Sequence, residues 1–463
     1  MAAETYDVIV IGAGQAGGPL ATTFASAGRK TALIEREHVG GTCINTGCTP
    51  TKTMVASARV AYLARRGAEY GVETGSISIN LATVRGRKRK IVDSFRNGSQ
   101  SSIENVVGVD LIFGAASFSS ATSIVVNLNA GGKRELAAPT IIINAGARST
   151  VPPLPGLDGV PFLDSTSIME LDTVPEHLIV LGGGYIGLEF AQMFRRFGSN
   201  VTIIQRGDQV LAREDADIAE AVAAILREDG IEVLLNTAAV SVAHNPAGGI
   251  EVQVREADAA ERAITGSHLL VAIGRTANAD TLNLAAAGIH RDKRGFIPVD
   301  ERLQTNVAGV YALGDINGGP AFTHIAYDDF RIVRTNLIEH GDATTAGRLV
   351  PYTVYIDPQL GRVGLSERDA QEQGRSVRVA QMPMTHVARA LEMAETRGVM
   401  KILVDPATKH ILGCAILGVE GGEMMSVIQL AMLGKLPYTT LRHAIFAHPT
   451  LAESFNNVFG QLD

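Results

Sequence analysis

Two cysteines lie close enough in the sequence to act as a redox pair. Cys43 and Cys48 stand five positions apart, just before a helical pattern that runs from Thr53 to Arg66. Thiols at this spacing can close a small disulfide ring, and a helix N-terminus lowers a thiol pKa and so favours the thiolate. A tetrahedral zinc site would need a second cluster of cysteines or histidines, which the neighbouring sequence lacks. The pair therefore predicts dithiol redox chemistry and no metal site.

A histidine near the C-terminus offers acid–base chemistry. His448 is followed by Pro449 and then by Glu453. An imidazole with a pKa near neutrality can take a proton from a thiol and return it to a leaving thiolate. Glu453 would fix the tautomer of that imidazole. His443 has no such neighbour and is expected to be structural, and Cys414, within an apolar run, is expected to be a buried strand residue.

One pattern of strand, glycine turn, helix and strand occurs twice. The first turn follows the apolar run Tyr6–Ile11, and the second follows Leu178–Leu181. Backbone amides at such a helix N-terminus can hold a pyrophosphate, so each copy predicts a dinucleotide-binding site. The glycines of the two turns are Gly12, Gly14 and Gly17 in the first and Gly182, Gly184 and Gly187 in the second.

The two copies keep the same register, and they differ at the residue that would contact the ribose. Glu35 lies 23 positions after Gly12, and Gln205 lies 23 positions after Gly182. A carboxylate accepts hydrogen bonds from unphosphorylated ribose hydroxyls. In the second copy the carboxylate is absent and Arg206 follows, which favours a 2′-phosphate. We expect NADPH to be preferred over NADH at the second site, with use of both left open.

The elements around these motifs predict an α/β protein of several domains, because 463 residues exceed what one core organises. A proline-rich stretch, Pro152–Gly156, separates the two copies, and the tail reads as an antiparallel sheet with a helix at Glu423–Leu433. We predict a first dinucleotide-binding domain from residues 1–150 and 275–347, a second from 151–274, and an α+β domain from 348–463.

Composition excludes several classes of partner. The net charge of −7 gives no basic field for nucleic acid or an anionic membrane. The basic run from Arg85 to Lys90 is expected to be a solvated helix face. Three cysteines do not form a secreted disulfide framework, and neither a signal peptide nor a long apolar run is present. We expect a cytoplasmic protein.

The motifs, in this order, resemble the class I pyridine nucleotide-disulfide oxidoreductase family, which includes glutathione reductase, dihydrolipoamide dehydrogenase and mercuric reductase. They comprise the glycine turn with Glu35, the segment Gly40–Lys52, the second turn, Ala312–Asp315, and His448–Glu453. The match covers nearly the whole chain and is nearest to the mercuric reductase-like branch. It implies a glutathione reductase-like fold: two Rossmann-like domains, binding FAD and NAD(P)H, and a C-terminal dimerisation domain.

The resemblance also implies roles for individual residues. Cys48 would lie against the flavin as the charge-transfer thiolate, and Cys43 would attack the substrate disulfide. Lys52 would lie beside the flavin and pair with Glu189, and Tyr185 would cover the flavin until nicotinamide displaces it. His448 and Glu453 would complete the site of the partner subunit in a homodimer. The remaining implied contacts are Thr42, Gly146 and Asp315 to FAD and Gly274 to NAD(P)H.

Three functions remain open. The leading hypothesis is NAD(P)H-dependent reduction of a disulfide or another thiol-reactive compound. The second is reduction of a soft metal ion, Hg(II) or Cu(II), by the same dithiol, although the chain ends at Phe459–Asp463 without the vicinal cysteines of mercuric reductases. The third is a flavin-loaded redox sensor or complex subunit, against which the presence of His448 argues.

Overall fold

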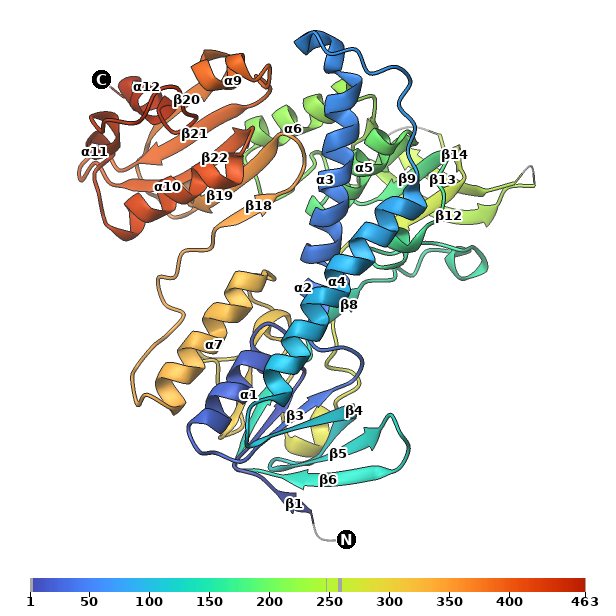
Figure 1. Ribbon diagram of the computed structural model, residues 1–463, viewed down its shortest axis with the longest axis vertical. Helices are drawn as coiled ribbons and strands as arrows, with labels where there is room; N and C mark the ends of the chain where they lie inside the picture. Colours follow the sequence, from blue (N-terminus) through green and yellow to red (C-terminus); the bar gives the residue numbers. More distant parts are fainter. Residues whose placement is uncertain (1–2, 247, 257–259, 463) are drawn as a thin grey trace. The chain divides into compact units, whose positions relative to one another are not determined.

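The computed structural model describes residues 3–246, 248–256 and 260–462, and these form two compact units (Figure 1). The first unit comprises the chain up to Thr53, Thr83–Thr150 and Gly274–Arg348. The second comprises Met54–Ala82, Val151–Ile273 and the chain from Leu349. The finer division into FAD-binding, NAD(P)H-binding and dimerisation domains stays a prediction.

The first unit is built on an eight-stranded sheet in the order β1-β6-β5-β4-β3-β2-β7-β17. Strands β4, β3, β2, β7 and β17 run parallel, while β4, β5 and β6 form an antiparallel meander. The strands are β1 (Glu4–Thr5), β2 (Val8–Ile11), β3 (Thr31–Glu35), β4 (Val109–Ser120), β5 (Ser123–Leu128), β6 (Lys133–Ala137), β7 (Thr140–Ile143) and β17 (Val310–Ala312), with β8 (Ala147–Ser149) and β16 (Arg275–Ala277) as a separate pair. The helices are α1 (Gly17–Ser26), α2 (Gly41–Asn45), α4 (Leu81–Glu104) and α7 (Thr323–Leu337), and α3 (Cys48–Arg65) begins here.

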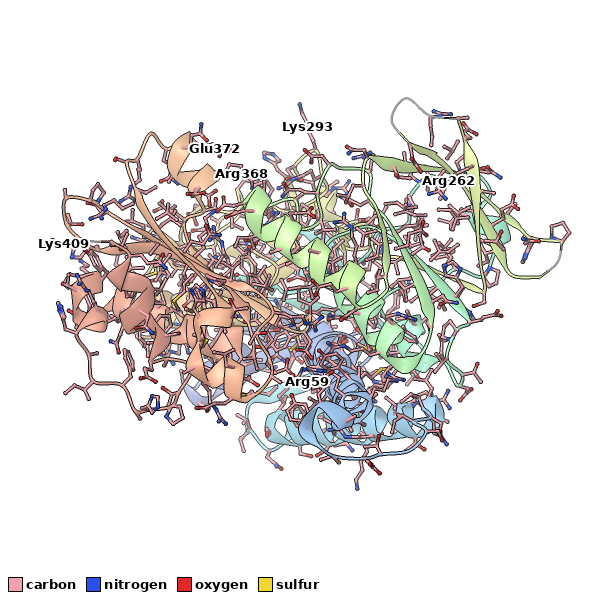
Figure 2. The ribbon with its side chains drawn as sticks, turned by 90° about the horizontal axis from the view of Figure 1, so that it is seen from above. Arg59, Arg262, Lys293, Arg368, Glu372 and Lys409 are labelled. Carbon is pink, nitrogen blue, oxygen red and sulfur yellow. The ribbon has the colours of Figure 1, made fainter. Side chains whose placement is uncertain are left out.

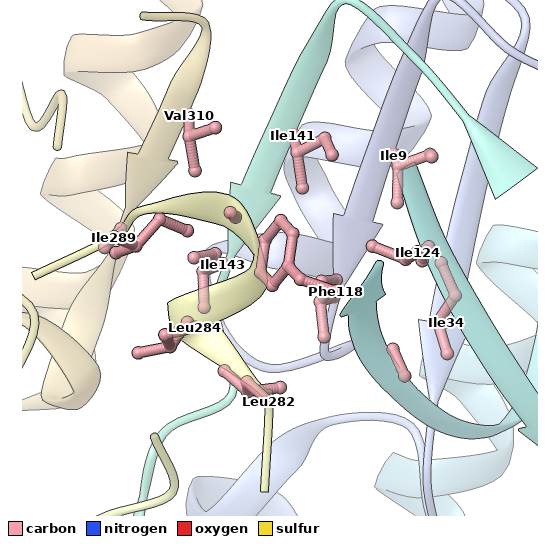
Figure 3. Close-up of a cluster of buried hydrophobic side chains, with 14 of the residues drawn as sticks. Ile9, Ile34, Phe118, Ile124, Ile141, Ile143, Leu282, Leu284, Ile289 and Val310 are labelled. Atoms are coloured by element: carbon pink, nitrogen blue, oxygen red, sulfur yellow. The ribbon is translucent and has the colours of Figure 1, made fainter. Parts of the chain in front are cut away.

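Strand β2 shows why the parallel sheet forms. All four of its residues are β-branched and buried, as a strand covered on both faces requires. Val8 and Val10 pack in the core that contains residues of α1 and α7. Ile9 and Ile11 point to the opposite face, in the cluster around Phe118 (Figure 3). The strand therefore places the glycine turn that follows it at the carboxyl edge of a rigid sheet.

The second unit contains three sheets. A parallel sheet has the order β11-β10-β9-β15, a meander the order β12-β13-β14, and an antiparallel sheet the order β18-β19-β22-β21-β20. The strands are β9 (His177–Leu181), β10 (Asn200–Ile204), β11 (Glu232–Leu234), β12 (Thr237–His244), β13 (Ile250–Glu256), β14 (Arg262–Gly266), β15 (His268–Val271), β18 (Tyr352–Val354), β19 (Gln359–Gly364), β20 (Arg378–Pro383), β21 (Val399–Val404) and β22 (Ile411–Gly418). The helices are α5 (Tyr185–Phe197), α6 (Ala216–Glu228), α8 (Glu367–Glu372), α9 (Ala388–Glu392), α10 (Gly421–Leu433), α11 (Tyr438–Arg442) and α12 (Ser454–Gly460). The predicted antiparallel tail is confirmed, and β19 and β20 are strands that the sequence did not predict.

Two sequence-based expectations need correction. The helix expected from Thr53 begins at Cys48. Pro50 does not prevent this, because it lies in the first turn, where the backbone N–H groups make no hydrogen bond within the helix. The basic run on α4 is not wholly solvated, since Lys88 is only 3% exposed while Arg87 and Arg89 beside it are exposed. The buried position of Cys414 in β22 is confirmed, and burial raises the pKa of its thiol to about 12.

Candidate active site

The first glycine turn leaves no room for side chains. Gly12 has a φ of +100°, and a Cβ atom on Gly17 would lie 2.0 Å from the carbonyl oxygen of Gly12. The N–H of Gly17 donates to the side chain of Asn144 at 3.0 Å. Asn144 is buried at the end of β7 and also donates to the carbonyl of Leu313. Sequence reasoning missed Asn144, whose one signal is a polar residue directly after the apolar strand Thr140–Ile143.

Glu35 closes the first dinucleotide-binding motif at the end of β3. One carboxylate oxygen accepts a hydrogen bond from the N–H of Ala13 at 2.9 Å, and the other accepts one from the N–H of Glu37 at 2.8 Å. The carboxylate is thus fixed beside the glycine turn with lone pairs left for further donors. This position fits the predicted contact with ribose hydroxyls.

The thiol-bearing segment lies against this same turn. A Cβ atom on Gly41 would lie 2.8 Å from the Cα of Gly14, so glycines at both positions allow the two backbones to meet. The N–H of Gly40 donates to the carbonyl of Ala13 at 2.8 Å, and the side chain of Gln15 donates to the carbonyl of Gly40 at 3.0 Å. The redox pair is therefore held next to the first dinucleotide-binding turn by backbone contacts.

Cys43 and Cys48 occupy different local environments. Cys43 lies half-buried in α2, beside Thr42, and Cys48 is exposed as the first residue of α3. A hydrogen bond with Cys48 and burial together raise the pKa of Cys43 well above its ordinary value. The Sγ atom of Cys48 lies 3.4 Å from the hydroxyl oxygen of Thr323. Cys43 therefore holds its proton more tightly than an ordinary thiol.

Asn45 shapes the turn between the cysteines and was also missed by sequence reasoning. Its side-chain N–H group donates to the carbonyls of Val39 and Gly41, both at 2.9 Å. Its side-chain carbonyl accepts a hydrogen bond from Arg96 of α4 at 2.6 Å. These contacts tie the segment between the two cysteines to α4 and to the backbone that precedes Cys43.

Asp315 and Gly146 lie at the same carboxyl edge. Burial raises the pKa of Asp315, and Arg275, with its Nε atom 3.6 Å away, opposes that shift. Gly146 has a φ of +66° and open space where a Cβ atom would lie. The carbonyl of Gly274, expected to face NAD(P)H, accepts a hydrogen bond from the N–H of Thr150 inside the first unit.

The second glycine turn repeats the first in detail. Gly182 has a φ of +109°, and a Cβ atom on Gly187 would lie 2.2 Å from the carbonyl oxygen of Gly182. Gly184 caps α5, which begins at Tyr185, a residue with 37% of its surface exposed. The side chain of Gln205 accepts a hydrogen bond from the N–H of Gly183 at 2.9 Å. Arg206, the next residue, is exposed.

Three further predicted residues have defined surroundings in the second unit. Glu189 is buried on α5 and accepts a hydrogen bond from the N–H of Tyr355 at 2.8 Å. The Nδ1 atom of His448 lies 2.9 Å from a carboxylate oxygen of Glu453, and 68% of the His448 side chain is exposed. The expectation that Glu453 fixes the His448 tautomer is consistent with this contact. The pairing of Lys52 with Glu189 stays a prediction.

The predicted residues fall into two groups. The first unit holds Gly12, Gly14, Gly17, Glu35, Thr42, Cys43, Cys48, Lys52, Gly146, Gly274 and Asp315, and the second holds Gly182, Gly184, Tyr185, Gly187, Glu189, Gln205, Arg206, His448 and Glu453. Among the residues that the structure describes, no group of three or more His, Cys, Asp or Glu side chains could hold a metal ion. No helix in the same described ranges is long and apolar enough to cross a membrane.

Two dinucleotide-binding turns, one of them in contact with a dithiol segment, define a nucleotide-linked dithiol oxidoreductase. Comparison with known proteins gives the family. Residues 6–329 match the family described as pyridine nucleotide-disulphide oxidoreductase, and residues 350–459 match the dimerisation domain of that family. The chain belongs to the pyridine nucleotide-disulphide oxidoreductase family.

Individual relatives agree with this assignment. The chain is 40% identical to the probable pyridine nucleotide-disulfide oxidoreductase RclA of Escherichia coli, with 98% of each chain covered. It is 34% identical to a mercuric reductase of Bacillus cereus, over 97% of this chain and 70% of the relative. A solved structure described as the Cu(II) complex of the HOCl-induced flavoprotein disulfide reductase RclA superposes with a TM-score of 0.90 at 38% identity, covering 99% of this chain and 100% of the other.

These findings confirm the family, the glutathione reductase-like α/β fold and the class of activity. The chain is an FAD- and pyridine nucleotide-dependent oxidoreductase that passes electrons to a disulfide or thiol-reactive substrate. The first glycine turn fits a dinucleotide such as FAD, because its glycines have no side chains that would block the approach of a pyrophosphate to the backbone. The helix that follows, α1, has no acidic residue in its first helical turn that would repel the phosphates. The residues that would hold FAD are Gly12, Gly14, Gly17, Glu35, Thr42, Lys52, Gly146 and Asp315.

Proposed function

We propose that the chain is an NADPH-dependent disulfide reductase in which Cys43 and Cys48 form the redox pair. The observation that carries this proposal is the contact of Gly41 with Gly14, which holds the thiol segment against the first dinucleotide-binding turn. Bound FAD would accept the hydride of NADPH and deliver two electrons to the disulfide. The remaining chemistry belongs to side chains of the protein.

Cys43, the thiol whose pKa is raised, needs a base that removes its proton before it can act as a nucleophile. His448 would take the proton of Cys43, and the resulting thiolate would attack the substrate disulfide, forming a mixed disulfide and releasing one thiolate. That thiolate would take the proton from His448. Cys48 would then attack the sulfur of Cys43, release the second substrate thiolate and restore the intrachain disulfide. Glu453 would hold the imidazole, since its carboxylate lies 2.9 Å from Nδ1.

NADPH is proposed over NADH because of the second turn. Gln205 supplies the hydrogen bond to Gly183 without the negative charge that Glu35 carries in the first turn. Arg206 is exposed directly beyond β10, and Arg213 is exposed in the same loop. A guanidinium group at either position can bind a 2′-phosphate.

A homodimer is proposed for the working enzyme. The segment that matches the dimerisation family exposes large apolar side chains, among them Leu430 (69%), Leu433 (60%) and Ile445 (102%). Apolar surface of this kind is typical of obligate interfaces. His448 lies near Ile445 in the sequence and would serve the site of the partner subunit. A cytoplasmic location is proposed on the small number of cysteines.

A second candidate is reduction of a soft metal ion by the same dithiol. Two observations favour it: a similar solved structure is described as a Cu(II) complex, and mercuric reductases are among the relatives. The ion would be the electron acceptor in place of a disulfide. This reaction would not need His448 as a proton donor.

One experiment separates the two candidates. The holoenzyme is reduced anaerobically with NADPH and mixed in turn with oxidised glutathione, lipoamide, Cu(II) and Hg(II), and recovery of the oxidised flavin spectrum is followed. Rapid recovery with one disulfide supports the disulfide reductase. Recovery with metal ions alone would replace it with the second candidate.

A further inference from the structure

The loop between β10 and α6 carries the two arginines proposed to bind the 2′-phosphate. Arg206 lies near the start of this loop and Arg213 near its end, and both are exposed. Between them, Leu211 is buried, and its N–H donates to the carbonyl of Gly183 at 2.9 Å. The loop is therefore tied to the second glycine turn, whose backbone amides are expected to hold the pyrophosphate.

One side chain from the segment that matches the dimerisation domain binds the end of this loop. The guanidinium of Arg368, the second residue of α8, donates to the carbonyl of Ala212 at 3.0 Å and to the carbonyl of Arg213 at 2.8 Å. These two carbonyls belong to the peptide planes on either side of the Cα atom of Arg213. Because each peptide unit is planar, holding both carbonyls fixes the direction of the Cα–Cβ bond of Arg213. A guanidinium suits this contact, since its N–H groups form a rigid fork.

The backbone of Arg368, which is labelled in Figure 2, is anchored to the same stretch of chain. The carboxylate of Asp215 accepts hydrogen bonds from the N–H groups of Glu367 and Arg368, both at 3.2 Å. Asp215 also forms an ion pair with the Nζ atom of Lys401 at 3.0 Å, and both of these side chains are buried. The start of α8 is thus held beside the start of α6. The Arg368 side chain therefore reaches the loop from a fixed base.

We propose that Arg368 is a positioning residue for the nicotinamide cofactor, because it holds the backbone of Arg213 so that the Arg213 guanidinium faces the 2′-phosphate of NADPH. Arg368 acts through the two peptide planes that flank Arg213. The segment that matches the dimerisation domain thereby contributes to the choice between NADPH and NADH. This inference rests on the proposed preference for NADPH.

Anaerobic reduction of the flavin in the holoenzyme tests the inference, because this half-reaction needs no disulfide or metal acceptor. The rate is followed at increasing NADPH and at increasing NADH, which gives an apparent Kd and a limiting rate for each cofactor. Arg368→Ala should raise the apparent Kd for NADPH by about fivefold, the effect of losing one hydrogen bond of ordinary strength. The Kd for NADH and both limiting rates should stay unchanged, because NADH has no 2′-phosphate.

Two further variants serve as comparisons. Arg368→Lys replaces the fork with a single ammonium group and should raise the Kd for NADPH by less than Arg368→Ala does. Arg375→Ala is the matched control, because Arg375 is an exposed arginine seven positions away whose guanidinium lies 3.9 Å from Asp405. This variant should leave the Kd of both cofactors unchanged. If Arg368→Ala is unstable, Arg368→Gln also removes the fork and should give a rise for NADPH alone.

A double-variant cycle separates positioning of Arg213 from general support of the fold. If Arg368 acts through Arg213, then Arg368→Ala should have no further effect on the Kd for NADPH in a chain that already carries Arg213→Ala. A full additional loss of affinity in that background overturns the inference. An equal loss of affinity for NADPH and NADH in Arg368→Ala overturns it as well, since that result indicates general structural support.

Failure of the inference differs from failure of the proposed cofactor preference. If Arg368→Ala leaves the Kd for NADPH unchanged while Arg206→Ala or Arg213→Ala raises it, the inference is overturned and the preference for NADPH stands. A wild-type enzyme that binds NADPH and NADH equally well, or a variant with both Arg206→Ala and Arg213→Ala that keeps the preference, would overturn the proposed 2′-phosphate site and the inference with it.

Discussion

The side-chain carbonyl of Gln205 accepts a hydrogen bond from the backbone N–H of Gly183 at 2.9 Å. Glu35 makes the same contact with Ala13 in the first dinucleotide-binding turn, also at 2.9 Å. Gln205 therefore keeps the hydrogen bond that orders the turn and lacks the charge that would repel a phosphate.

Cofactor preference should change when this charge is restored. Gln205→Glu combined with Arg206→Ala should lower kcat/KM for NADPH relative to NADH by about tenfold or more, since the loss of one charge-assisted hydrogen bond is worth about 1.5 kcal/mol. Steady-state kinetics with both cofactors measure the ratio. Arg206→Lys, which keeps a positive charge, is the control. An unchanged ratio would mean that the 2′-phosphate binds elsewhere.

The two thiols should fail in different ways. Cys48→Ser should lose both turnover and the long-wavelength absorbance band of the thiolate beside the flavin, whereas Cys43→Ser should keep the band and lose turnover, because only the exposed thiol would face the flavin. Anaerobic spectra and disulfide reduction assays measure the two properties. Cys414→Ala, at a buried position in β22, should retain both. Full activity in Cys43→Ser contradicts the assigned roles.

His448 should matter for one half-reaction only. His448→Ala should slow reoxidation by a disulfide by about 10²–10⁴-fold, the usual contribution of a general acid–base group. Flavin reduction by NADPH should be unaffected, because that step uses no proton from this side chain. Stopped-flow absorbance resolves the two steps. The exposed His443, five residues away, is the matched control, and equal slowing of both half-reactions removes His448 from acid–base chemistry.

Stability of the second unit should depend on Asp357. Its carboxylate forms ion pairs with Arg196 and with Arg59, which is labelled in Figure 2, and only 14% of the Asp357 side chain is exposed. Asp357→Asn should lower the free energy of unfolding by about 2 kcal/mol, because it removes one charged partner of both guanidinium groups. Arg59 keeps its ion pair with Glu395, and Arg196 keeps its ion pair with Asp229. The midpoint of urea unfolding measures this. Asp280→Asn is the control, because its ion pair with Arg148 is exposed: 50% of the Asp280 side chain and 48% of the Arg148 side chain are accessible. This change should alter the free energy of unfolding by less than about 1 kcal/mol.

The same carboxylate predicts a pH dependence. Burial alone would raise the pKa of Asp357, but Arg196 and Arg59 hold it below its ordinary value. A lowered pKa means that the stabilisation is complete above the unfolded-state pKa, about 3.9 for Asp. It is lost as the pH falls through the lower pKa of the folded state. The difference between wild type and Asp357→Asn should therefore shrink below about pH 4, and a difference that grows in acid contradicts this account.

The features that depend on local spacing could be predicted from the sequence. The two glycine turns, their 23-residue register and the position of the thiol pair just before a helix follow from short segments, because a strand, turn and helix are specified by neighbouring residues. The start of α3 was predicted at Thr53 and lies at Cys48, because the proline at position 50 is tolerated in the first turn of a helix.

Which distant residues complete the site could be learned from the folded chain alone. Asn144 reaches Gly17 across 127 positions, and Thr323 reaches Cys48 across 275. Parallel strands bring their carboxyl ends to one edge whatever their separation in the chain, so α7, which follows β17, can meet the start of α3 in the segment that follows β3. The burial of Lys88 on the basic stretch of α4 could not be predicted from the sequence either, because the charges of neighbouring residues do not show what packs against a helix.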